Sequence, residues 1–151
     1  MIIRQYTKED IDGVVSVCKE FAEISTMSKI PFVEEDTKEF MLAAIDNENF
    51  FQNILLCPKG SVVGVCAFYL SPPPFNHSVL LAAEAWWYVT PRYRSGIWAI
   101  KLLKKTIEDC VSKNVFEVTL TLEEHLDKRM HSLYKRLGFK KKESTYFMER
   151  E

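Results

Sequence analysis

Residues 84–103 constrain the fold of this chain more than any other stretch. They read EAWWYVTPRYRSGIWAIKLL: an aromatic and β-branched run that stops at Pro91, a basic turn that holds Gly96, and then a helical pattern. The sequence therefore predicts a strand, a turn and a helix N-terminus in series. The first turn of a helix leaves backbone N–H groups unpaired and carries the positive end of the helix dipole. Because two arginines and a serine precede it, a phosphate-bearing cofactor is the first functional hypothesis.

The composition narrows the class of protein. The chain has 151 residues, of which 47% are hydrophobic and 27% charged, so we expect a single globular domain over residues 1–151. The formal net charge of −1 gives no reason to expect binding to nucleic acid or to an anionic membrane. No apolar run approaches the ~20 residues that cross a bilayer, and the N-terminus lacks the apolar core of a signal peptide. We therefore expect a cytoplasmic protein.

The cysteines point to the same compartment. The sequence contains four cysteines, and they form neither a Cys-x-x-Cys pair nor a zinc-binding pattern with the three histidines. We interpret them as buried thiols in a reducing environment and expect no metal site.

Hydrophobic periodicity predicts the other elements. Strands are expected at 1–5, 51–57, 61–70, 79–90, 116–122 and 144–148, and helices at 8–24, 33–47, 96–113 and 126–137. A tight turn at residues 58–60 indicates an antiparallel hairpin, whereas the strand-helix-strand unit around Gly96 requires a parallel pair. The predicted fold class is α/β, of the α+β type, with a mixed and mostly antiparallel sheet and flanking helices.

The turn resembles motif A of the GNAT N-acetyltransferase superfamily. In that motif a strand ending in Val-x-Pro leads into Arg/Gln-x-x-Gly-x-Gly/Ala and a helix that begins with paired leucines. The positions in register are Val89, Pro91, Tyr93, Arg94, Ala99, Leu102 and Leu103. In this register Ile97 occupies the first motif glycine, and Gly96 lies one residue early. A loop one residue shorter would bring Gly96 into place but would put Tyr93 where the Arg or Gln belongs, and both registers stay open.

A second segment, residues 130–139, resembles motif B of the same superfamily. There, Leu-Tyr-x-x-x-Gly-Phe closes a helix before the final strand, and this chain has Leu133, Tyr134, Gly138 and Phe139 at the fixed positions. Two partial matches in the right order, together with the predicted element order, imply the GNAT fold. In that fold the two parallel strands splay apart.

The resemblance implies acetyl transfer from acetyl-coenzyme A to an amine by direct attack in a ternary complex. The turn would wrap the pyrophosphate of coenzyme A with backbone N–H groups, and the exposed backbone of the preceding strand would pair with the pantetheine arm. The implied cofactor-binding residues are Tyr88, Val89, Arg94, Ser95, Gly96, Ile97, Trp98 and Ala99.

Two residues are candidates for the proton transfers that this chemistry needs. The attacking amine must lose a proton to a base, and the departing thiolate must gain one from an acid. Tyr134 matches the superfamily tyrosine that protonates the thiolate, and a phenol is suitable because it is protonated at neutral pH; the alternative is a core aromatic. Glu84 is the candidate base, because burial in an apolar strand would raise its pKa. The alternatives for Glu84 are an exposed strand end or an ion pair.

Several alternatives stay open. Strand alternation puts Trp86 and Tyr88 on one face with Glu84, and Trp87 on the other.

The acceptor is a small-molecule or peptide amine that the sequence does not identify, and homodimers are common among similar proteins. The alternative function is a catalytically inactive GNAT-like module that binds acyl-coenzyme A or a protein partner, which the irregular glycine loop favours. The net charge disfavours a nucleic-acid binder.

Overall fold

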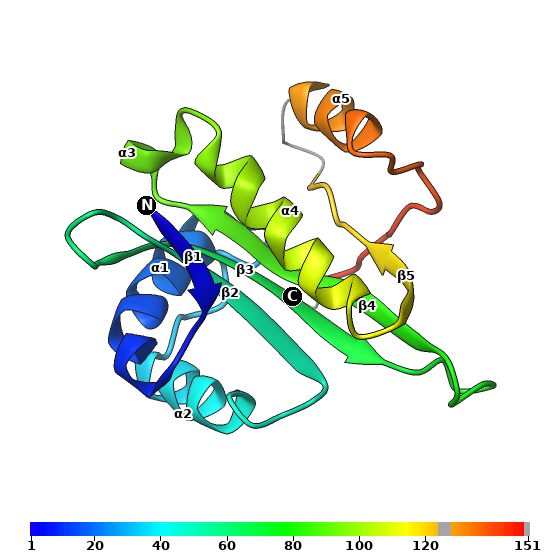
Figure 1. Ribbon diagram of the computed structural model, residues 1–151, viewed down its shortest axis with the longest axis horizontal. Coiled ribbons are helices and arrows are strands. Elements are labelled where there is room, and N and C mark those ends of the chain that lie inside the picture. Colours follow the sequence, from blue (N-terminus) through cyan, green and yellow to red (C-terminus); the bar gives the residue numbers. More distant parts are fainter. Residues whose placement is uncertain (124–127, 150–151) are drawn as a thin grey trace. The chain divides into compact units, whose positions relative to one another are not determined.

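A computed structural model describes residues 1–123 and 128–149, which fall into two compact units divided after Thr121. The first unit holds a five-stranded sheet in the order β1-β2-β3-β4-β5 (Figure 1). Its strands are β1 (Ile2–Gln5), β2 (Phe50–Leu56), β3 (Val62–Ser71), β4 (Leu80–Val89) and β5 (Val115–Thr119). Its helices are the 3-10 turn η1 (Lys8–Asp10), α1 (Ile11–Ile24), α2 (Glu34–Ala44), α3 (Pro91–Arg94) and α4 (Trp98–Val111). The second unit contains α5 (Lys128–Arg136).

The pairing confirms the predicted mixed sheet of the α+β class. Strands β1 to β4 pair antiparallel, and β4 pairs with β5 in parallel. The hairpin between β2 and β3 turns at Gly60, which has a φ of 85°. A left-handed backbone of this kind favours glycine over any residue with a side chain, and this is the local reason for the turn.

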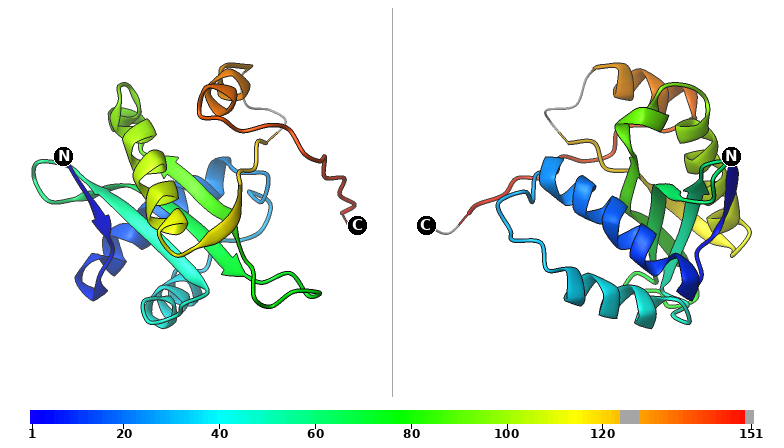
Figure 2. Two further views of the ribbon diagram at one scale, coloured as in Figure 1. Left: turned by 45° about the vertical axis from the view of Figure 1, so that its right-hand side comes forward. Right: turned by 90° about the vertical axis from the view of Figure 1, so that its left-hand side faces the viewer.

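Helices cover both faces of the sheet within the first unit (Figure 2). On one face, buried residues of α1 and α2 such as Val14 and Met41 form a single apolar cluster with Ile54 and Val65 of the sheet. On the other face, α4 contacts β2, β3 and β4 and buries Leu102 completely. Burial on both faces is most complete along β2 and β3, whereas most residues of β4 are only partly buried.

Two polar side chains of β2, Gln52 and Asn53, form hydrogen bonds to residues of β4 and α4. Strand β2 is buried along its whole length, so its amides need partners inside the protein. The Gln52 Oε1 atom accepts a hydrogen bond from Trp86 Nε1 at 2.8 Å, and Asn53 Nδ2 donates to Asp109 of α4 at 2.8 Å. Each face of β2 is thereby tied to a neighbouring element.

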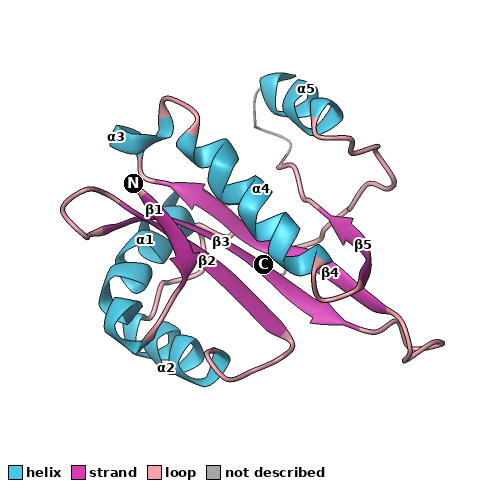
Figure 3. Ribbon diagram, viewed as in Figure 1, coloured by secondary structure: helices cyan, strands magenta, loops and turns pink. Residues whose placement is uncertain are grey.

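The predicted last strand at residues 144–148 is wrong, because residues 139–149 contain neither helix nor strand (Figure 3). A strand needs a neighbour for its backbone groups and a buried face for its side chains. Here the side chains of Tyr146, Phe147 and Met148 are 83–94% exposed, so no burial stabilises a strand. The predicted start of the last helix, Leu126, lies outside the described residues.

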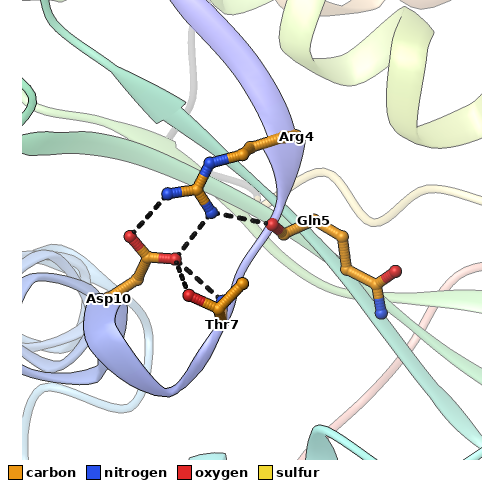
Figure 4. A network of polar contacts seen from close by, with 4 residues as sticks. All are labelled: Arg4, Gln5, Thr7 and Asp10. Carbon is orange, nitrogen blue, oxygen red and sulfur yellow. Dashed lines mark hydrogen bonds and ion pairs between the residues drawn. The ribbon is translucent and has the colours of Figure 1, made fainter.

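An ion pair ties β1 to the start of α1 (Figure 4). The Arg4 guanidinium donates to both carboxylate oxygens of Asp10, at 2.7 and 2.9 Å, and the Thr7 N–H donates to the same carboxylate at 2.8 Å. Asp10 is only 9% exposed. The hydrogen bonds from Arg4 are the main reason why the pKa of Asp10 is lowered.

Asp10→Asn is expected to lower the free energy of unfolding by ~2 kcal/mol at pH 7, since charge-assisted hydrogen bonds are lost. The folded pKa of Asp10 lies below its ordinary value of 3.8, so the carboxylate stabilises the fold above that value. This stabilisation disappears as the pH falls through the folded pKa, and the two proteins should converge in acid. Urea unfolding at pH 7 and in acid measures the difference. Asp12→Asn is the control, because Asp12 is 89% exposed, and an equal effect of both substitutions at pH 7 would contradict the account.

No helix among the described residues is both long and apolar enough to cross a membrane. All four cysteines are buried and free, as the sequence predicted.

Candidate cofactor and acyl-transfer site

The two parallel strands separate part of the way along β4. Residues 80–83 of β4 pair with residues 115–119 of β5, whereas β4 continues to Val89 with β3 as its strand partner. Within the described chain, no strand pairs with the other edge of residues 84–89. An extended ligand with amide groups can bind such an edge in the way that an added strand would. We call this place the fork.

Glu84 lies at the fork itself. Its Oε2 atom accepts a hydrogen bond from the backbone N–H of Thr121 at 2.7 Å, just after the last paired residues, Ala83 and Thr119. The carboxylate thus binds a β5-side backbone donor at the point where strand pairing stops. The structure therefore gives the predicted base a definite position between the two strands.

A β-bulge next to Glu84 changes the faces of β4. Ala67 of β3 pairs with Trp86 and Phe68 pairs with Glu84, which leaves Ala85 as an extra residue. Ala85 and Trp86 consequently both pack against the cluster under α1 and α2. The predicted alternation, with Glu84 on the face of Trp86 and Tyr88, is wrong because the bulge breaks the period of two.

The turn between β4 and α4 is built for backbone contacts. Gly96 has a φ of 118°, and an added Cβ atom would meet nothing within 4 Å. The space beside Gly96 is open, so crowding is not the reason for a glycine here. The reason is the positive φ, which residues with a side chain rarely adopt. In the described structure α4 begins at Trp98 without a side-chain cap and without an acid in its first turn. Its first N–H groups are therefore available to an anion.

Cations surround this turn, but Arg94 is already engaged. Its Nε atom donates to the Val89 carbonyl at 3.1 Å, and its guanidinium lies 5.0 Å from the centre of the Tyr88 ring. The structure thus brings Arg94, Tyr88 and Val89 together at the end of β4, where Arg94 holds the strand end against α3. Lys101 lies 4.5 Å from the centre of the Trp98 ring in the first turn of α4. Binding of these residues to coenzyme A stays a prediction.

Trp87 carries a buried polar atom that the described chain leaves without a hydrogen bond. Its Nε1 is buried and has no hydrogen-bond partner within the described chain. A buried donor without an acceptor costs about 1–3 kcal/mol. Trp87 lies in the part of β4 that β5 leaves uncovered. A donor at this place, an open strand edge and an uncapped helix start together fit a ligand that carries both amides and phosphates, as coenzyme A does.

In the second unit, the residues of motif B form the C-terminal cap of α5. α5 ends in a Schellman motif: the Phe139 N–H donates to the Tyr134 carbonyl at 3.0 Å, and the Gly138 N–H donates to the Lys135 carbonyl at 3.0 Å. Gly138 has a φ of 91°, so the predicted glycine C-cap is confirmed. The rings of Tyr134 and Phe139 lie 6.2 Å apart, which is the apolar contact that accompanies this cap. The fixed positions of motif B are thus the parts of one helix ending.

Sequence reasoning missed two features of the site. The bulge has no marker in the sequence, since its extra residue is an alanine and not a glycine. The contact of Glu84 with Thr121 joins residues 37 positions apart, and no local pattern encodes it.

Comparison with known proteins agrees with this geometry. The family model described as "Acetyltransferase (GNAT) family" matches residues 18–139. A Trypanosoma brucei acetyltransferase has a similar structure, with 17% identity, a TM-score of 0.77 and 99% of each chain covered. AAC(6')-Iy in complex with the bisubstrate analog CoA-S-monomethyl-acetylneamine shares 14% identity, with a TM-score of 0.78 over 99% of this chain and 97% of the other.

A ribosomal-protein-alanine N-acetyltransferase from Brucella melitensis biovar Abortus 2308 shares 14% identity, with a TM-score of 0.72 over 99% of this chain and 100% of the other. At these identities the likeness shows the fold alone. No curated protein matches the sequence. The family match covers most of the chain and confirms the resemblance predicted from the two motifs: the chain belongs to the acetyltransferase (GNAT) family.

Proposed function

We propose that this protein is an acetyl-coenzyme A-dependent N-acetyltransferase that moves an acetyl group to a primary amine. The observation that carries the proposal is the fork, because within the described chain no strand pairs with residues 84–89 of β4 on the side of β5, and β4 leads through α3 to the start of α4, which has no side-chain cap. Family membership supports acetyl transfer as the chemistry. The likeness to a structure solved with a coenzyme A-containing analog supports the donor.

In this proposal the open edge at Tyr88 and Val89 pairs with the pantetheine amides, and the turn from Arg94 through Ser95, Gly96, Ile97 and Trp98 to Ala99 holds the pyrophosphate. Bound acetyl-coenzyme A supplies an activated acyl group as a thioester. The chain itself supplies orientation by the strand edge, anion binding by the helix start and the groups that move protons.

Glu84 acts in the proposal as the base that takes the proton of the attacking amine, directly or through water. The Thr121 N–H donates to this carboxylate at 2.7 Å, which fixes the position of the proposed base at the fork. Tyr134 acts as the acid that donates its phenolic proton to the departing thiolate. This assignment rests on the match of Leu133, Tyr134, Gly138 and Phe139 to motif B.

Turnover tests the proposal directly. Purified protein is incubated with acetyl-coenzyme A and a panel of primary amines, and both free coenzyme A thiol and the acetylated amine are measured by mass spectrometry. Equimolar formation of the two products is expected for at least one amine. Binding of acetyl-coenzyme A without product from any amine or peptide would favour the alternative, an inactive acyl-coenzyme A-binding module. The observation that favours this alternative is the irregular loop, in which Ile97, 58% exposed, stands at the position of the first motif glycine.

Gly96→Val tests the cofactor half of the proposal. A β-branched residue is strained at a φ of 118°, so the turn has to change its backbone path and its N–H groups lose their alignment. The dissociation constant for acetyl-coenzyme A is expected to rise at least about tenfold, as for a loss of ~1.4 kcal/mol. Isothermal titration calorimetry measures this. Gly60→Val is the control, since its φ of 85° imposes similar strain at a hairpin outside the site, and equal affinities of both variants would contradict the assignment.

A further inference from the structure

A pocket of about 260 Å³ lies in the first unit between α1, α2 and the sheet. Its wall contains five aromatic residues from five parts of the chain: Phe21, Phe32, Phe40, Tyr69 and Trp86. The pocket opens to solvent beside Met27 and Phe40, which are 55% and 39% exposed. It is thus a concave apolar site and not a closed packing defect.

Three polar groups in the pocket wall, those of Trp86, Thr37 and Ser25, are hydrogen-bonded within the protein. Trp86 Nε1 donates to Gln52 at 2.8 Å, and the Thr37 hydroxyl donates to the Val33 carbonyl at 3.0 Å. The Ser25 hydroxyl donates to the Ala22 carbonyl at 3.1 Å. Burial raises the pKa of the Cys18 thiol in the wall to about 12, so this group stays neutral. The pocket therefore recognises shape and apolar surface.

The lining residues include no carboxylate. Moving an ammonium group into such surroundings without a partner costs several kcal/mol. The charged end of an amine is therefore excluded from the pocket, whereas an apolar group attached to that amine is favoured inside. A polyamine or an aminoglycoside, which carries several cations, does not fit this lining.

The pocket and the proposed acyl-transfer site share strand β4: the pocket lies on the α1 and α2 face of the sheet, and Glu84 lies at the strand edge beside Thr121. Trp86 forms part of the pocket wall and belongs to the segment of β4 beyond the fork, two residues after Glu84. The bulge at Ala85 is what turns Trp86 toward α1 and α2 while Glu84 binds Thr121. An acceptor seated against Trp86 would therefore lie beside the strand whose open edge is assigned to the acyl donor.

From these observations we propose that the acceptor is a monoamine with an apolar, aryl-sized body, and that this body occupies the pocket while the amine points out toward the fork. The proposal rests on the proposed function and narrows its substrate class. The volume agrees with it, since a dry apolar cavity of about 150 Å³ already holds benzene. A cavity of about 260 Å³ accommodates a phenyl ring with a short alkyl arm.

A homologous series tests the proposal. Each additional buried methylene is worth ~0.8 kcal/mol, so kcat/KM should rise roughly fourfold per carbon from propylamine to hexylamine. Phenethylamine should exceed the flexible polar amine 2-(2-aminoethoxy)ethanol by more than about thirtyfold. A flat series, or faster acetylation of spermidine than of phenethylamine, would overturn the inference and leave the acetyltransferase function intact.

Ala22→Phe tests the location of the apolar body. Ala22 lines the pocket from α1, and a phenylalanine there fills the space. The advantage of phenethylamine over the polar amine should disappear, while the affinity for acetyl-coenzyme A stays unchanged. Glu23→Phe adds the same ring at the next, exposed position of α1 and should have no effect. If Ala22→Phe fails to fold, Met27→Lys at the mouth serves instead, and the cation should weaken binding of phenethylamine at least about tenfold.

Binding without turnover separates the two proposals. Tryptophan fluorescence during titration with phenethylamine, with and without coenzyme A, measures the pocket even in a protein that does not transfer acetyl groups. Saturable binding that Ala22→Phe weakens and Glu23→Phe does not would support the pocket whether or not the function holds. No saturable binding in either condition would overturn it.

Discussion

Tyr134→Phe is expected to lower kcat by about 10²–10⁴-fold, the usual contribution of a positioned acid, and to leave the dissociation constant for acetyl-coenzyme A unchanged. The reason is that the thiolate would lose its proton donor, while the aromatic ring of the side chain is kept. The ring of Tyr134 contacts Phe139 at a centroid distance of 6.2 Å, and the backbone carbonyl of residue 134 accepts the Phe139 N–H. A phenylalanine preserves both interactions, so the helix ending should survive.

Steady-state kinetics and calorimetry on Tyr134→Phe measure these two effects separately. Tyr146→Phe is the matched control, because Tyr146 is 94% exposed and belongs to no helix or strand. If Tyr134→Phe kept wild-type kcat, the side chain would be only a part of the helix cap. The acid would then have to come from another group or from water.

Glu84→Gln is expected to lower kcat/KM by about a hundredfold at neutral pH, since the amide is no base. The loss should shrink as the pH rises toward the pKa of the amine, because a growing fraction of the acceptor is then neutral without help. The amide oxygen of Gln can still accept the Thr121 N–H bond, which measures 2.7 Å in the parent protein. The fork should therefore keep its geometry.

A pH series of kcat/KM for wild type and Glu84→Gln checks this expectation. Glu23→Gln on the exposed side of α1 serves as the control for a lost surface charge. A deficit that is the same at every pH would indicate that Glu84 only positions β5 through Thr121. Glu84→Ala distinguishes the two roles further, since it removes the hydrogen bond to Thr121 as well as the charge.

The sequence predicts the first unit well where local rules decide the structure. Gly60 marks a hairpin and Gly96 a turn because both need positive φ values, and the apolar periodicity of α1 and α4 identifies helices that cover a sheet. The parallel pair follows from a helix between two strands. These local signals suffice for the fold class and for the position of the turn to which we assign phosphate binding.

The features that the sequence does not predict depend on contacts between distant residues. The bulge at Ala85 arises from the register of β4 against β3. Because of this bulge, the side chains of Glu84 and Trp86 lie on different faces of the strand. The hydrogen bond between Glu84 and Thr121 and the unpaired donor of Trp87 likewise exist only in the folded chain. At residues 144–148 the local pattern predicts a strand, but none forms, because the side chains there are not buried.

The central claim is that the fork and the turn at Gly96 bind acetyl-coenzyme A, and thermal unfolding with and without this ligand tests it most directly. At about 100 times the dissociation constant, a bound ligand stabilises the folded state by ~2.7 kcal/mol, which raises the melting temperature of a domain of this size by several degrees. NADH and ATP are controls for nonspecific anion effects. A rise that is selective for acetyl-coenzyme A is the expected result. No shift at millimolar acetyl-coenzyme A, or an equal shift with ATP, would contradict the account.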